Sequence, residues 1–235
     1  MKTERGRIGR GAISARWALA VVLVALSSAV ALSHAQQPEK ASRFSDRDPG
    51  SVRPLDIVKS SVERVLAMVQ SSPTAVSEGR RRSDIRQVAD GLFDFREMGR
   101  LALAGHWKER TPREQQEFVQ LFTALLERSY LSSIENYAGE KIIFLSESVS
   151  GGYAQVRSRI TTDRRVDISI DYRLLDNGTR WVVYDVVLDG VSLVSNYRSQ
   201  FNSIIRTSGF VELLARLRNK EIEAHVVPRL GRPRS

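Results

Sequence analysis

The fold is decided by residues 179–210, TRWVVYDVVLDGVSLVSNYRSQFNSIIRTSGF. The first part predicts a strand from Trp181 to Leu188 and a tight turn at Asp189-Gly190. The apolar spacing then becomes helical, which predicts an amphipathic helix carrying Leu193, Val194, Tyr197, Phe201 and Ile204. Both faces of the strand are apolar, and Asp185 is its only charge. Because this segment is rich in apolar surface and poor in nucleophiles, bases and metal ligands, it indicates a protein that encloses an apolar ligand.

The N-terminus has the layout of a secretory signal peptide. Five basic residues between Lys2 and Arg16 precede the apolar run from Trp17 to Leu26. Small residues then offer cleavage sites after Ala31 and after Ala35. The run breaks at Ser27 and is shorter than the ~20 residues of a membrane span. We therefore expect residues 1–35 to be a cleaved signal peptide and the mature chain to be periplasmic.

Charge and cysteine content restrict the class of protein. The leader carries five basic residues and one acidic residue, so its removal lowers the net charge from +9 to +5. A basic chain can bind nucleic acid, anionic lipid or an acidic protein. Export and the absence of aromatic residues interleaved with basic ones argue against nucleic acid. The chain has no cysteine, so its stability in an oxidising compartment does not depend on disulfides.

The mature chain is predicted to contain one domain with polar ends. Residues 36–53 lack hydrophobic periodicity and predict a disordered lead-in. Residues 54–221 form the predicted domain, and residues 222–235 form a basic C-terminal tail. No internal repeat is evident.

Helices fill the first half of the domain. A first helix begins at Pro54, and a second is expected to open at Ser83 or Asp84. Asp94 is the predicted N-cap of a third helix that runs towards Trp107. The fourth begins with Thr111-Pro112-Arg113-Glu114, a capping box with proline at the first helical position, and runs to about Tyr137.

The second half changes from helical to alternating periodicity. Four strands are predicted, at Lys141–Ser148, Tyr153–Thr162, Val166–Leu175 and Arg180–Leu188. Short turn sequences separate them, including residues 163–165, and apolar side chains alternate with polar ones along the third strand. Two helices follow, from about Ser192 and from Phe210 to Lys220. The predicted fold class is α+β: a curved four-stranded antiparallel sheet with helices packed over one face.

Catalytic and metal-binding patterns are not found in the sequence. It has no G-x-S-x-G elbow, phosphate loop or dinucleotide fingerprint. None of His34, His106 and His225 has a second histidine at metal-ligand spacing, so no metal is expected, and His106 is interpreted as a helix-end residue. Asp185 keeps one enzymatic alternative open. A buried carboxylate of this kind, with Tyr172 or Tyr184 nearby, could be the general base of an isomerase-like enzyme.

Three blocks of sequence carry a family resemblance. They are the helix that opens at Thr111-Pro112 and continues through FVQLF (118–122), the pair YDV (184–186) and GVSL (190–193), and RTSGF (206–210). In these blocks the chain resembles the MlaC/toluene-tolerance family of periplasmic phospholipid-binding proteins. The resemblance covers about residues 54–221, and the YDV…GVSL block is its most specific part.

The resemblance implies a function and a set of partners. It implies a non-enzymatic, soluble and monomeric carrier that shuttles phospholipid between the outer membrane and an inner-membrane ABC transporter and so maintains outer-membrane lipid asymmetry. The partners would be the transporter with its periplasmic substrate-receiving subunit and an outer-membrane lipoprotein/porin complex. The phospholipid would be cargo, and no cofactor is expected. A carrier for another apolar ligand, such as a hopanoid or a fatty acid, would have the same sequence pattern.

The resemblance places the acyl chains between helices and sheet, so the candidate lipid-binding residues are those on the inward stripes. They are Val65, Val69, Leu92, Met98, Leu101, Phe118, Phe122, Leu125, Ile168, Ile170, Tyr172, Val183, Val194, Tyr197 and Phe201. An ordinary packed core would produce the same stripes, and we expect about half of these residues to touch lipid.

Overall fold

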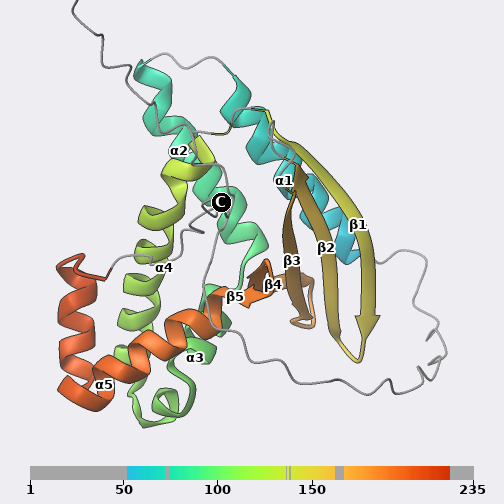
Figure 1. The fold of residues 1–235 in the computed structure, drawn as a ribbon. Coiled ribbons are helices and arrows are strands. Elements are labelled where there is room, and N and C mark those ends of the chain that lie inside the picture. The colour runs from blue at the N-terminus through green and yellow to red at the C-terminus, as the bar shows by residue number, and fades with distance from the viewer. Residues whose placement is uncertain (1–51, 72–74, 136, 138, 162–166, 223–235) are drawn as a thin grey trace, which may run out of the picture.

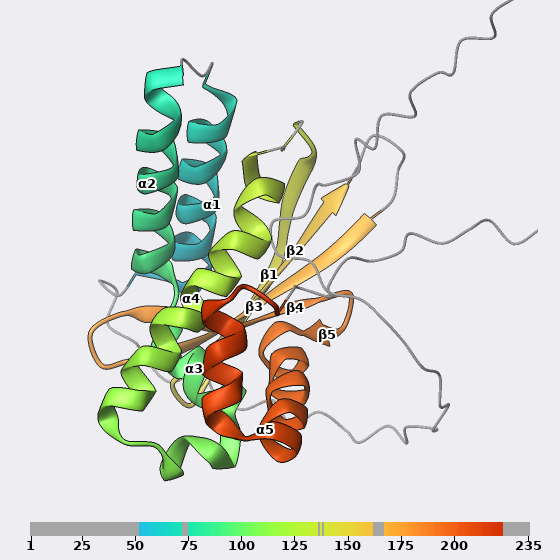
Figure 2. The same ribbon diagram turned by 90° about the vertical axis from the view of Figure 1, so that its left-hand side faces the viewer.

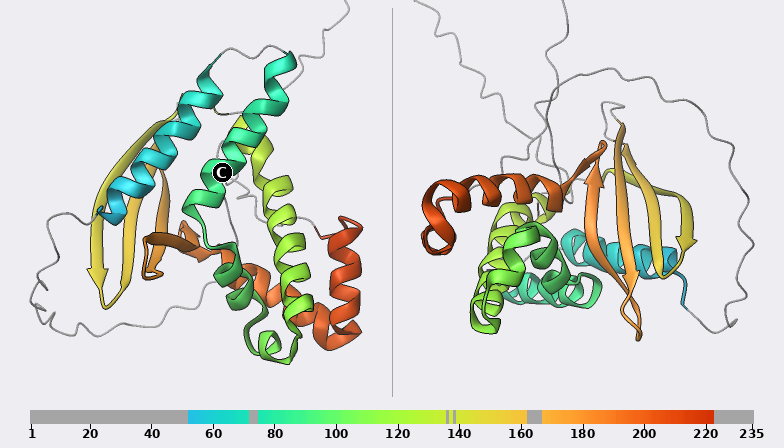
Figure 3. Two further views of the ribbon diagram at one scale, coloured as in Figure 1. Left: turned by 180° about the vertical axis from the view of Figure 1, so that it is seen from behind. Right: turned by 90° about the horizontal axis from the view of Figure 1, so that it is seen from below.

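The computed structural model describes residues 52–71, 75–135, 137, 139–161 and 167–222. The predicted signal peptide, the lead-in before residue 52, the turn at 163–165 and the tail from residue 223 lie outside these residues. The described chain is an α+β fold in which the helices lie on one side of a curved antiparallel sheet (Figures 1 and 3). This confirms the predicted fold class.

The sheet is an antiparallel meander with strand order β1-β2-β3-β4-β5. Its first four strands are β1 (Lys141–Ser150), β2 (Tyr153–Thr161), β3 (Asp167–Asp176) and β4 (Trp181–Leu188), close to the predicted bounds. Along β2 and β3, buried residues alternate with more exposed ones. Both faces of β4 are buried, as its continuous apolar sequence predicts.

The predicted count of four strands is wrong by one. A two-residue strand, β5 (Val191–Ser192), pairs with β4 through Val187↔Ser192 and Leu188↔Val191. The turn between them has positive φ at both Asp189 (44°) and Gly190 (84°), which is the backbone of a tight hairpin. So short a strand has no periodicity of its own, and the sequence pattern assigned Ser192 to the start of the following helix.

Helix α1 (Pro54–Gln70) lies across the inner face of the sheet, where it packs against β1 and β2 (Figure 3). Its N-cap residue, Arg53, provides no side-chain cap. The missing cap comes from the sheet, because Glu147 of β1 accepts a hydrogen bond from the Leu55 backbone N–H at 2.6 Å. Glu147 also pairs with Arg53 at 3.4 Å. A carboxylate at the positive end of the helix dipole therefore fixes α1 to the sheet.

Helix α2 (Ala75–Leu92) runs beside α1 (Figure 2) and begins eight residues before the predicted Ser83. The early turns contain Arg80, Arg81 and Arg82 and carry no apolar stripe, so the sequence pattern missed them. Contacts with other residues stabilise them instead. Arg82 donates to Glu135 of α4 (Pro112–Glu135) at 2.6 Å and lies 3.3 Å from Glu78 one turn earlier.

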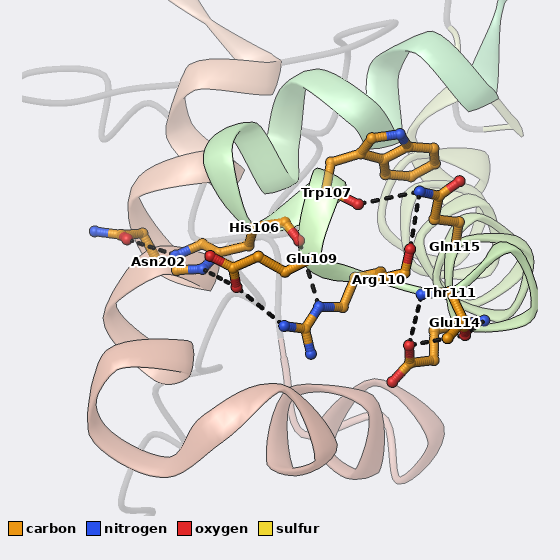
Figure 4. Close-up of polar contacts among 8 residues, drawn as sticks. All are labelled: His106, Trp107, Glu109, Arg110, Thr111, Glu114, Gln115 and Asn202. Atoms are coloured by element: carbon orange, nitrogen blue, oxygen red, sulfur yellow. Dashed lines mark hydrogen bonds and ion pairs between the residues drawn. The ribbon is translucent and has the colours of Figure 1, made fainter.

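Caps set the limits of the next two helices. The Asp94 carboxylate accepts from the Glu97 N–H at 2.8 Å and so caps α3 (Phe95–Leu103), as predicted. The chain then turns through a 3-10 helix, η1 (Ala104–Glu109), before α4 begins. At the start of α4, Thr111 and Glu114 form the predicted reciprocal capping box (Figure 4). The hydrogen bonds from the Thr111 backbone and hydroxyl hold the pKa of Glu114 below its usual value.

The two helices predicted at the C-terminus form one kinked element, α5 (Leu193–Arg218), which ends two residues before the predicted Lys220. The kink is at Gly209, whose φ of 85° and ψ of 168° are not helical. The two parts of α5 therefore run in different directions (Figure 2). Only glycine adopts this backbone conformation readily, so Gly209 explains why the RTSGF block interrupts the helix.

Candidate lipid-binding site

The inner face of the sheet is an apolar surface built by alternate residues of three strands. β2 contributes Val156 and Ile160, and β3 contributes Ile168, Ile170 and Leu174, all buried. The paired register places these side chains beside one another across β2 and β3. Two half-buried residues of β1 extend the surface, Ile142 and Phe144. They were not among the predicted site residues, although the same alternation could have identified them.

Helix α1 faces this surface with a stripe that is only partly covered. Val58 and Val62, in its first half, are buried. Val65, Leu66 and Val69, in its second half, are half-buried. The apolar stripe therefore continues beyond the part of α1 that the fold covers completely.

The aromatic residues of the predicted site gather elsewhere, between α4 and α5. Phe122 lies 5.3 Å from Tyr197 and 5.5 Å from Phe201, measured between ring centroids, and Phe118 lies 5.5 Å from Phe201. These four side chains and Leu125 have no accessible surface. They touch no space large enough for a water molecule, so in this structure they form a dry helical core.

The other predicted site residues lie around the junction of sheet and helices. Leu92 ends α2, and Met98 and Leu101 lie on α3; Leu101 is half-buried and the other two are buried. Val183 is in β4, and Val194 is in the first turn of α5. The structure thus separates the fifteen residues into a sheet-and-α1 group, a junction group and the dry aromatic cluster. Which of them contact lipid stays a prediction.

Two polar side chains interrupt the inner face of the sheet. Ser158 is buried and donates to the Ile170 carbonyl oxygen at 3.1 Å. Tyr172 is also buried, and its burial raises the pKa of its phenol from 10 to about 12. Tyr172 is therefore neutral at physiological pH, and the inner face carries no charge along β3.

Asp185 is a structural residue that joins β4 to α5. Its carboxylate accepts hydrogen bonds from Arg173 at 3.1 Å, from the Ser192 hydroxyl at 2.7 Å and from the Val194 N–H at 3.1 Å. Ser192 in turn caps α5 by accepting from the Ser195 N–H. These contacts account for the spacing of the YDV and GVSL blocks, because the aspartate and the serine meet only if a tight turn separates them.

This arrangement leaves Asp185 poorly placed to act as a general base. The register pairs Arg173 with Asp185, so the carboxylate lies on the face of the sheet opposite to Tyr172. Tyr184 lies at an irregularity in the β3–β4 register, and its ring packs against Tyr153 at 6.0 Å. Tyr172 and Asp185 therefore lie on opposite faces of the sheet, and the Asp185 oxygens already accept three hydrogen bonds.

The described residues contain no cluster of three or more histidine, cysteine, aspartate or glutamate side chains that could hold a metal ion. None of the helices they form is both long and apolar enough to cross a bilayer.

Comparison with known proteins identifies the family. The family model of the MlaC protein matches residues 59–219, which is more than half of the chain, so this chain belongs to the MlaC family. The intermembrane phospholipid transport system binding protein MlaC of Haemophilus influenzae is 20% identical over 171 residues, covering 70% of this chain and 80% of the relative. A phospholipid-binding protein of Ralstonia solanacearum, solved in complex with a phospholipid, matches with a TM-score of 0.63 and 24% identity. That match covers 72% of this chain and 98% of the other, and at this identity it shows a shared fold.

Proposed function

We propose that this protein is a periplasmic carrier that shuttles phospholipid between the outer membrane and an inner-membrane ABC transporter. The observation that carries the proposal is membership of the MlaC family together with the apolar inner face of the sheet. The Haemophilus relative, an intermembrane phospholipid transport system binding protein, and the phospholipid bound by the Ralstonia protein support it.

The energetics of lipid transfer explain why a carrier of this design is useful. Moving one methylene group from bilayer to water costs ~0.8 kcal/mol, so two long acyl chains face a barrier of roughly 20 kcal/mol or more. A protein lowers that barrier only if it offers the chains an uncharged apolar surface. The inner face of β2 and β3 has this character, and no catalytic group is needed for the task.

We place the acyl chains between α1 and the inner face of the sheet. The proposed walls are Val65 and Val69 of α1 and Ile168, Ile170 and Tyr172 of β3. The half-covered stripe of α1 supports this location, because it marks the border where the helix could separate from the sheet. The aromatic cluster of α4 and α5 would stay closed and maintain the fold during loading.

The compartment and the partners follow from the same proposal. The leader in the sequence supports export, after which the chain would begin near Ala31 or Ala35. The partners would be the ABC transporter with its periplasmic receiving subunit and the outer-membrane lipoprotein/porin complex. The mass of the protein recovered from a periplasmic extract without detergent checks the cleavage and the compartment together.

The identity of the cargo can be tested directly. The mature protein is purified without detergent and extracted with organic solvent, and the extract is analysed by mass spectrometry. We expect diacyl phospholipid in near-stoichiometric amount. A hopanoid or a free fatty acid would replace the proposed cargo, and an empty extract from a folded protein would contradict the carrier function. A sample of a periplasmic protein without a lipid site, purified in the same way, controls for carry-over.

A further inference from the structure

An open hollow of about 320 Å³ lies between the α3–η1 junction and α5, apart from the inner face of the sheet. Residues Leu103 to His106 line one side, and Arg198, Ser199 and Asn202 of α5 line the other. Its volume is at the lower limit of small-ligand sites. Four of its seven lining residues carry polar side chains and most of the seven are exposed, unlike the residues of the proposed lipid site.

The α5 wall of this hollow is positively charged. Residues 190–211 contain no aspartate or glutamate, and their only charges are Arg198 and Arg206. Among the described residues Arg198 forms no ion pair, and its one hydrogen bond is long, 3.5 Å from Nη2 to Ser195 Oγ. Later in the same helix, Arg216 and Arg218 pair with Glu212 and Glu117. Arg198 therefore keeps most of its donors for a group outside the molecule.

A second donor comes from Asn202. His106 Nε2 lies 3.0 Å from Asn202 Oδ1, and the two side chains meet across the gap between η1 and α5 (Figure 4). When the ring N–H donates to this oxygen, the Asn202 amide NH₂ is free to donate. Glu109 Oε2 lies 3.8 Å from His106 Nδ1, on the other side of the imidazole, and 3.0 Å from Arg110 Nη2. Its charge is thus engaged by a neighbouring cation.

The backbone that forms the other wall is strained. Ala104 has a φ of 49° and a ψ of −123°, a conformation that residues with a side chain rarely adopt. This turn directs the chain from α3 into η1 and places His106 opposite α5. Strain of this kind is found preferentially where the surrounding structure uses it to position functional groups.

We propose that the hollow is a docking site for a carboxylate side chain of a partner protein, with Arg198 and Asn202 as its donors. A guanidinium binds a carboxylate through two parallel hydrogen bonds, and the adjacent amide adds a third. The proposal deepens the proposed function, because the partner would belong to the lipid-transport machinery. The docking chemistry itself does not depend on the cargo.

The character of the surface favours a protein partner over a membrane. Faces that bind membranes combine basic residues with exposed apolar ones. The exposed residues on this part of α5 are polar: Arg198, Ser199, Asn202, Ser203 and Arg206. Of the exposed large apolar side chains in the described residues, all but Val211 lie on other elements. A hollow that admits one side chain also suits a protruding protein residue better than a flat lipid surface.

Amide NMR with short peptides tests the site. The ¹⁵N-labelled mature protein is titrated with acetyl-Gly-Glu-Gly-amide and, separately, with the glutamine version of the same peptide. We expect saturable shifts of the Gly105 backbone amide, the Arg198 Nε–H and the Asn202 side chain with the glutamate peptide only. Arg198→Gln should weaken binding roughly tenfold or more, as expected when a charged hydrogen-bonding partner is lost. Arg216→Gln, on the same helix but paired with Glu212, should leave it unchanged.

Several outcomes would overturn the proposal. Equal shifts with both peptides, or none with either, would exclude a carboxylate site. Tighter binding of inorganic phosphate at the same amides would make this a phosphate site. Flotation with phosphatidylglycerol vesicles that is lost in Arg198→Gln would make it a membrane contact. Lipid extraction distinguishes a failure of the docking site from a failure of the carrier function. Arg198→Gln should keep its full cargo. A lipid-free wild type with intact peptide binding would contradict only the carrier function.

Discussion

At the scale of single residues, Asp185 shows how one buried carboxylate can hold a fold together. Its oxygens accept hydrogen bonds from a guanidinium, a hydroxyl and a backbone N–H. All three donors come from segments that must meet for α5 to start correctly. Burial alone does not distinguish this structural role from that of a catalytic base, because both roles require it. The difference lies in whether the lone pairs are already occupied.

Asp185→Asn tests this structural role. The substitution keeps the shape of the side chain but removes the charge that Arg173 and the start of α5 stabilise. We expect a loss of about 1.5–3 kcal/mol in the free energy of unfolding, the usual value of hydrogen bonds to a charged group. Urea denaturation of the purified mature protein measures it. A variant that is more stable than the wild type would point instead to a strained functional carboxylate.

Ile170 and Phe122 provide a paired test of the proposed pocket. Both are buried and apolar, but Ile170 lies on the inner face of the sheet, on which α1 packs against β1 and β2, whereas Phe122 lies in the dry aromatic cluster. A buried unpaired charge costs several kcal/mol. Ile170→Asp should remain folded, because its position becomes hydrated when α1 separates, and it should lose most of its bound phospholipid. Phe122→Asp should unfold or aggregate.

Circular dichroism and lipid extraction of the two variants give the readouts. An Ile170→Asp protein that is folded and fully loaded would remove β3 from the pocket wall. A folded, lipid-free Phe122→Asp protein would move the pocket into the α4–α5 core.

At the scale of secondary-structure elements, α1 is attached to the sheet by a contact that sequence patterns do not reveal. Glu147 caps the helix from 92 residues away in the sequence. Because this contact lies at the N-terminal end of α1, whereas Val65 and Val69 lie near its other end, it is placed to act as a pivot. The rest of the helix could then move away from the sheet while its first turn stays docked.

Glu147→Ala should loosen α1. The loss of a charged N-terminal cap costs about 1 kcal/mol, which increases the open population roughly fivefold. Hydrogen exchange of the α1 amides should accelerate by that factor, and transfer of phospholipid to acceptor vesicles should become faster. Glu63→Ala is the matched control, since Glu63 forms only an exposed pair with Lys59 on the same helix. Unchanged α1 exchange in Glu147→Ala would show that the cap contributes nothing to docking.

Two glycines in helices should respond oppositely to the same substitution. Gly209→Ala places a side chain at a φ of 85° in the kink of α5 and should destabilise the protein by roughly 1–3 kcal/mol. Gly91 lies inside α2 with open space around its Cα, so Gly91→Ala should stabilise the helix by up to about 1 kcal/mol. Chemical denaturation of both variants checks the signs. A stable Gly209→Ala protein would show that the kink is not required.

At the scale of the whole molecule, the sequence predicts what depends on local periodicity. The four long strands, the Asp94 cap and the Thr111 box are recognisable because each signal lies within a few residues. The start of α2 depends on Glu135, a partner distant in the sequence, and the strand β5 is only two residues long and has no periodicity of its own, so the local pattern missed both. The candidate site can be predicted only in part. Periodicity identifies inward residues such as Ile170 and Phe122, but only the packing of α1, α4 and α5 distinguishes their surroundings.

The stability of the whole domain should depend on its cargo. A ligand present at about 100 times its dissociation constant adds ~2.7 kcal/mol to the native state, which for a domain of this size corresponds to about 5–10 °C in unfolding temperature. The inner face limits this effect, because without ligand Ile168 and Ile170 are already buried and part of the apolar contact is retained. Delipidated protein should therefore unfold several degrees below the protein as purified, and reloading from phospholipid vesicles should restore the difference. Differential scanning calorimetry measures both steps. Ile170→Asp is the control, because the unfolding temperature of a variant that takes up no lipid should not change on addition of vesicles. If the unfolding temperature of the wild type changes neither on lipid removal nor on reloading, the folded domain does not bind phospholipid.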